Sequence, residues 1–132
     1  MRGDGMKARI IVVISMLLIS VSVCLISMLY VRSAMNEMED MRIQTVLAVE
    51  EGRKEDALVL LTDMISLLDE RSRILECLTP HEDLHNLVIE LTTAKKSLMI
   101  GDMDDYKQSV MLIQEFSEHI RDHESLTLSN IL

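Results

Sequence analysis

Tryptophan is absent from this 132-residue chain, which also has only one Phe, two Tyr, one Pro and four Gly. Gly and Pro are the residues that most often interrupt helices, so their scarcity favours long, uninterrupted helices. No run of residues alternates between polar and apolar side chains as a half-buried strand does. The composition therefore predicts an all-α fold, and the length allows one compact domain.

Cysteine is also scarce, with Cys24 in an apolar run and Cys77 alone outside it. No disulfide can therefore form within the part of the chain that follows the run. We expect Cys77 to be either a small buried hydrophobic residue or one half of an intermolecular bridge.

Acidic residues outnumber basic residues after the apolar run. Residues 33–132 contain 9 Lys and Arg against 21 Asp and Glu, a net charge of −12. Nucleic acid is a poor partner for such a chain, because phosphate binding requires clustered Lys and Arg. A basic protein or divalent cations would be tolerated, and a solvated surface that keeps the domain soluble is the simpler interpretation.

Charge is missing altogether from residues 10–31, which are mostly Ile, Val, Leu and Met. Twenty-two residues at a rise of ~1.5 Å span roughly 33 Å, which matches a hydrocarbon core of ~30 Å. This stretch predicts a transmembrane helix that contacts the lipid bilayer. A cleaved signal peptide is the alternative, but the run exceeds the ~7–15 apolar residues typical of one. We therefore interpret it as an uncleaved signal anchor.

The orientation follows from the basic residues that flank this helix. Three precede it and two follow it: Arg2, Lys7 and Arg9 against Arg32 and Arg42. Because cytoplasmic flanks carry the excess of Lys and Arg, residues 1–9 are expected in the cytoplasm. Residues 32–132 then form a helical domain outside the plasma membrane, and the protein is single-pass.

Helical periodicity continues through residues 32–132. We expect the transmembrane helix to extend outward to Gly52, followed by helices over 54–78, about 80–100 and 103–123, with Gly52 and Gly101 in the turns. Thr79 and Glu82 are expected to form a capping box at the third helix. The fold class is thus one N-terminal transmembrane helix followed by two antiparallel helical hairpins packed as a small bundle.

The residues predicted to face the core recur at spacings of three and four. They are Met35, Met38, Met41, Val46 and Val49; Ala57, Leu61, Met64, Leu68, Leu75 and Leu78; Leu84, Leu87, Val88, Leu91, Ala94 and Leu98; and Tyr106, Val110, Ile113, Ser117 and Ile120. Six of the 11 methionines lie in or near these stripes and are expected to fill the core: Met35, Met38, Met41, Met64, Met99 and Met111.

One stretch matches a catalytic motif literally. Residues 81–85 read His-Glu-Asp-Leu-His, the H-E-x-x-H pattern in which two His bind Zn²⁺ and the Glu activates water. His119 and His123 form a second pair with the same spacing. Antiparallel packing of the third and fourth helices would place all four histidines at one level.

A zinc hydrolase is nevertheless the least favoured interpretation. The motif occupies the first turn of a helix, where free N–H groups and the macrodipole repel a cation. Helical-wheel positions also turn the two pairs toward different flanks. We therefore predict no catalytic residues, cofactor or bound metal, and retain His81, His85, His119 and His123 only as weak candidate ligands.

The order of short motifs resembles the bacterial domain-of-unknown-function family number 4363, small proteins with one N-terminal span and a helical remainder. The resemblance covers nearly the whole chain. It rests on the span, residues 52–58 (Gly-Arg-Lys-Glu-Asp-Ala-Leu), residues 81–84, Gly101-Asp102, His119-Ile120, and the tail 126–132 (Leu-Thr-Leu-Ser-Asn-Ile-Leu). It implies no particular activity. The apolar tail is expected to fold back onto the bundle or to dock into a partner.

Three function classes follow from these observations. The favoured one is a membrane-anchored, non-enzymatic module that binds another membrane or envelope protein, with self-association through residues 34–51 as a variant. The second is an extracytoplasmic ligand-sensing domain, which requires a pocket, although Tyr106 and Phe116 are the only aromatics beyond the span. The third is the zinc-dependent hydrolase.

Overall fold

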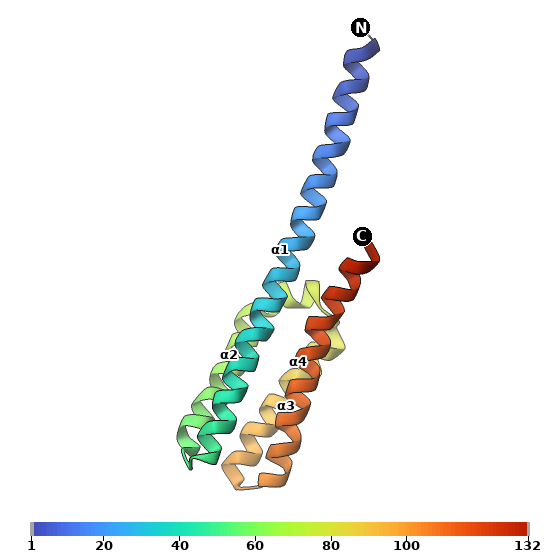
Figure 1. Cartoon of the computed structure of the whole chain (residues 1–132). Helices are drawn as coiled ribbons and strands as arrows, with labels where there is room; N and C mark the ends of the chain where they lie inside the picture. The colour runs from blue at the N-terminus through green and yellow to red at the C-terminus, as the bar shows by residue number, and fades with distance from the viewer. Residues whose placement is uncertain (1, 132) are drawn as a thin grey trace.

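The computed structural model describes the backbone of residues 2–131 and the side chains of residues 3–123 (Figure 1). The described chain consists of four helices: α1 (Arg2–Glu50), α2 (Lys54–Leu78), α3 (His81–Ile100) and α4 (Met103–Ile131). No strand occurs between residues 2 and 131. The prediction of an all-α fold is confirmed.

Helix α1 joins the apolar run to the rest of the molecule without a break. Every residue from 3 to 26 is exposed, whereas Val31, the last residue of the run, is completely buried. The helix is long and apolar enough to cross a membrane. Its continuation past Arg32 to the Gly52 turn is as predicted.

The part of α1 after Val31 packs with the other three helices around a shared core (Figure 1). α1 contacts α2 and α4, and α3 contacts the same two helices. The predicted stripes supply most of this core, because residues three and four apart lie on one helix face. On α1, four inward positions were not predicted: Val31, Ala34, Thr45 and Ala48.

Several predicted core residues are instead exposed. Met99 and Met111 are 59% and 71% exposed, so the expectation that they fill the core is wrong. Val88 is also exposed at its helix surface, and Cys77 is exposed rather than a buried hydrophobic residue. Met99 lies next to the turn that ends α3, and Met111 lies on the side of α4 opposite its buried stripe, so neither has a neighbour to cover it.

The two glycine turns have the same backbone geometry, and both lie at the end of the bundle remote from the N-terminus (Figure 1). Gly52 and Gly101 have φ angles of 77° and 82°. The amides after them reach back five residues, from Arg53 N to Ala48 O at 2.7 Å and from Asp102 N to Ser97 O at 2.9 Å. These bonds satisfy carbonyls at the helix ends, as in a Schellman motif.

We expect Gly101→Ala to destabilise the bundle by about 1–2 kcal/mol, because a Cβ is disfavoured in the left-handed region. A Cβ built at this position meets nothing within 4 Å, so the cost is conformational rather than a clash. Gly101→Asn is the control, since Asn tolerates this region better and should recover part of the loss. Denaturant titration of both variants followed by circular dichroism measures the difference. Equal losses for Ala and Asn would contradict the explanation.

The connection between α2 and α3 differs from the prediction. Thr79 does not form a capping box with Glu82: its N–H and its hydroxyl both donate to Leu75 O, at 2.8 and 2.7 Å. Pro80 is the N-cap of α3, with no side-chain capping bond. The threonine therefore ends α2 rather than starting α3.

Helix α4 is longer than predicted, since it continues past His123 to Ile131. Its C-terminal end rises beside α1 on the side of the bundle from which the N-terminal half of α1 projects (Figure 1). The prediction that the tail side chains of residues 126–132 fold back or dock into a partner lies outside the described side chains.

Candidate functional site

Three contacts between helices define the end of the bundle that is nearest to the apolar run. Arg71 Nη2 lies 3.1 Å from Glu37 Oε2, Arg121 Nη1 lies 3.2 Å from Asn36 Oδ1, and His119 Nδ1 lies 3.8 Å from Asp83 Oδ2. These pairs place the end of α2, the start of α3 and the last third of α4 at the height of residues 36–37 of α1. The H-E-x-x-H stretch and His119 therefore lie at the same end of the bundle.

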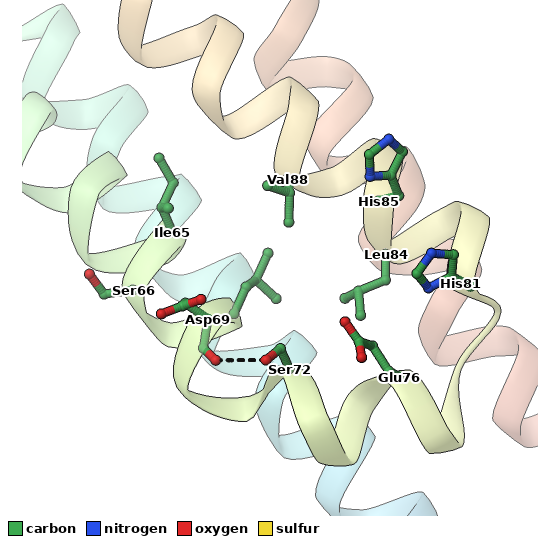
Figure 2. A pocket seen from close by; sticks show the side chains of 10 residues that line it. Ile65, Ser66, Asp69, Ser72, Glu76, His81, Leu84, His85 and Val88 are labelled. Carbon is green, nitrogen blue, oxygen red and sulfur yellow. Dashed lines mark hydrogen bonds between the residues drawn. The ribbon is translucent and has the colours of Figure 1, made fainter.

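The histidines at this end do not form one site. The His81 and His85 rings are nearly parallel, with centroids 6.4 Å apart, and line a hollow between α2 and α3 (Figure 2). His119 instead faces Asp83 across the boundary between α3 and α4. His123, one turn beyond His119, is exposed. Among residues 3–123, no three His, Cys, Asp or Glu side chains are placed to hold a metal ion.

A hollow with a volume of about 390 Å³ lies between α2 and α3. Its floor is apolar and its rim is polar (Figure 2). Buried Leu68 and Leu84 form the floor together with Ile65 and Val88. The remaining lining residues are Ser66, Asp69, Ser72, Glu76, His81 and His85. We call these ten residues the α2–α3 groove.

The carboxylates of the α2–α3 groove have no cationic partner among the described residues. Asp69 contributes only its backbone carbonyl, which accepts a bond of 2.9 Å from Ser72 Oγ (Figure 2), and Glu76 on the surface of α2 forms no ion pair with any described residue. A groove with an apolar floor and free carboxylates at its rim is suited to a ligand that is both apolar and basic.

His81 and His85 of this groove were singled out from the sequence as candidate ligands, but no residue of α2 was predicted to belong to a site. Ile65, Asp69 and Glu76 lie beside the α2 stripe rather than on it, so the stripe did not reveal them. One pattern could have done so: the stripe requires an apolar residue between Leu68 and Leu75, and Ser72 stands there instead. Ser72 is only half-buried and lines the groove between α2 and α3.

An ion pair within α1 lies near Tyr106 of α4. Arg42 donates to both carboxylate oxygens of Glu39, at 2.8 and 2.6 Å, and this hydrogen bonding lowers the pKa of Glu39 and raises that of Arg42. The nearby Tyr106 hydroxyl is buried without a partner, and burial raises the pKa of Tyr106. The phenol therefore stays neutral and the cluster is structural.

Comparison with known proteins supports the resemblance found in the motifs. The family model described as "Domain of unknown function (DUF4363)" matches residues 25–131, which include the outer end of the apolar run and all of the bundle. Neither the curated proteins nor the solved structures contain a match. Since the model covers most of the chain, the protein belongs to the DUF4363 family.

Proposed function

We propose that this protein is a single-pass, non-enzymatic membrane protein whose bundle binds another membrane or envelope protein through the α2–α3 groove. Residues 10–31 act as an uncleaved signal anchor, with residues 1–9 in the cytoplasm. Residues 32–132 lie outside the plasma membrane as two antiparallel hairpins, one of α1 with α2 and one of α3 with α4.

The observation that carries the binding proposal is the pairing of an apolar floor with unpaired carboxylates in the α2–α3 groove. Apolar contact supplies affinity, and complementary charge supplies orientation and specificity. The segments of α2 and α3 that line the groove lie toward the end of the bundle nearest to the apolar run (Figure 1), which puts the groove within reach of a partner in the same membrane. The expected partner segment is apolar with Lys or Arg on one side.

Site-specific crosslinking in native membranes tests this proposal. A photocrosslinking amino acid at Val88, inside the groove, is expected to give one discrete adduct with a different protein. The matched control is Val59, which is 58% exposed and lies outside the groove on α2. Adding Asp69→Lys and Glu76→Lys should reduce the adduct from Val88 by at least about tenfold, the effect of 1.4 kcal/mol.

The proposal fails if position 88 gives no adduct, or if positions 59 and 88 give the same products. An adduct of the protein with itself would indicate a homo-oligomer formed through the groove rather than a foreign partner.

A ligand-sensing domain is the second candidate, and the volume of the groove favours it. Small-molecule sites occupy about 300–1,000 Å³, and this hollow of about 390 Å³ falls at the lower end of that range. A sensor would be stabilised by a small basic amphiphile without any protein partner. Thermal denaturation of the full-length chain with and without such compounds distinguishes the two functions.

A further inference from the structure

One bond between α1 and α4 fixes the height of α4 relative to α1. The two helices are antiparallel neighbours (Figure 1), and Arg121 bonds to Asn36. Each further residue of α4 rises by ~1.5 Å, as does each earlier residue of α1. Residue 126 is therefore level with Val31, and residue 131 with Ile26, about 7–8 Å deeper into the apolar run.

Charged residues stop at the same height in the two helices. The last charged residue of α4 is Glu124, which is level with Ser33 by this register, next to Arg32, the first charge after the apolar run. From there, residues 125–132 read Ser-Leu-Thr-Leu-Ser-Asn-Ile-Leu and contain no charge. A stretch that becomes uncharged where the transmembrane helix enters lipid is compatible with the same environment.

Little protein is available to cover α4 at that height. Arg71 bonds to Glu37 and stacks over Tyr30 at 5.7 Å from the ring centroid, so the end of α2 at Leu78 is level with the outer end of the apolar run. Helix α3 begins at His81, on the bundle side of that level. Among residues 2–131, only α1 and α4 itself continue beyond it, and α1 is exposed from residue 3 through Ile26. Lipid is the apolar medium that remains.

We propose that residues 125–131 of α4 enter the outer leaflet beside α1 and give the bundle a second attachment to the lipid. This inference rests on the proposed anchoring of residues 10–31. Two contacts on different helices hold the bundle at a fixed height and tilt, whereas with one spanning helix alone the bundle would tilt together with that helix. The α2–α3 groove would then be held at a constant distance from the membrane surface.

Single tryptophan reporters test this placement, because the natural chain contains no Trp. The full-length chain is reconstituted in phosphatidylcholine vesicles whose acyl chains are brominated, since bromine quenches a Trp that contacts lipid. Leu128→Trp reports on α4. Leu18→Trp is the positive control within the apolar run, and Met111→Trp is the control on the exposed surface of α4, about 22 Å from the level of Val31.

We expect Leu128→Trp and Leu18→Trp to lose most of their emission in brominated vesicles, and Met111→Trp to keep it. Quenching at position 18 without quenching at position 128 would overturn the second attachment and leave the anchor intact. A blue-shifted but unquenched Trp at position 128 would also overturn it, because the tail would then be buried in protein. An unquenched Trp at position 18 would refute the anchor itself and the inference with it.

Discussion

Replacing both Leu18 and Val21 with Arg is expected to prevent the full-length chain from integrating into the membrane. Both residues lie in the apolar run of α1, 63% and 48% exposed, with no contact to the bundle that could shelter a charge. Arg near the centre of a span costs about 2.5–3.5 kcal/mol, whereas Leu or Val contributes about 0.3–0.6 kcal/mol. The double change is therefore unfavourable by roughly 6–8 kcal/mol.

That loss is comparable to the whole driving force for insertion. Residues 10–31 contain fourteen Leu, Ile and Val residues. At about 0.3–0.6 kcal/mol each, they supply roughly 4–8 kcal/mol. Alkaline carbonate extraction measures the outcome: the double Arg variant should be released, and the control with Ala at both positions should remain with the membrane. An Arg variant that still resists extraction would show that α1 is not held by its apolar run.

Features set by local geometry were predictable from the sequence. The end of a helix at Gly52 or Gly101 depends on one residue that adopts a positive φ, and both turns occur where expected. The predicted range 54–78 coincides with α2, because its apolar stripe and flanking residues agree. The stripe of α4 from Tyr106 to Ile120 is buried throughout for the same reason.

Features set by neighbouring helices were not predictable. Thr79 has a hydroxyl that can cap the next helix or bond back to the previous one, and the path of the chain toward Pro80 decides between them. Val88 lies on the predicted stripe, yet the polar residues opposite it on α2 leave it lining a groove. A periodic pattern identifies the face of a helix, but the width of that face depends on what packs against it.

The α2–α3 groove illustrates the same limit for function. The H-E-x-x-H pattern identifies His81 and His85 as candidate metal ligands, because i and i+4 residues share a helix face. In the structure these residues do share a face, and that face meets Asp69, Ser72 and Glu76 of α2 rather than the histidines of α4. Their surroundings, which only the fold determines, place them at the rim of the α2–α3 groove.

Replacing Leu91 with Ala is expected to lower the free energy of unfolding of the bundle by about 2–5 kcal/mol, because truncating a fully buried Leu leaves a cavity. Leu91 is 0% exposed in the middle of α3, among the core residues that α2 and α4 also supply. The control is Ile89→Ala, two residues away and 45% exposed, which should change stability by no more than about 0.5 kcal/mol. Denaturant titration of the full-length chain in lipid nanodiscs, followed by circular dichroism, compares the two variants.

The expected loss is large for this molecule because few other interactions can offset it. Both cysteines are free, and ion pairs at exposed positions contribute about 0–1 kcal/mol each. A domain of this size is typically stable by only about 5–15 kcal/mol, so one core leucine accounts for a substantial part of the total. Equal, small effects of Leu91→Ala and Ile89→Ala would mean that α3 does not present its Leu87–Leu91–Ala94 face to the core. The α2–α3 groove, which depends on that orientation of α3, would then have to be redefined.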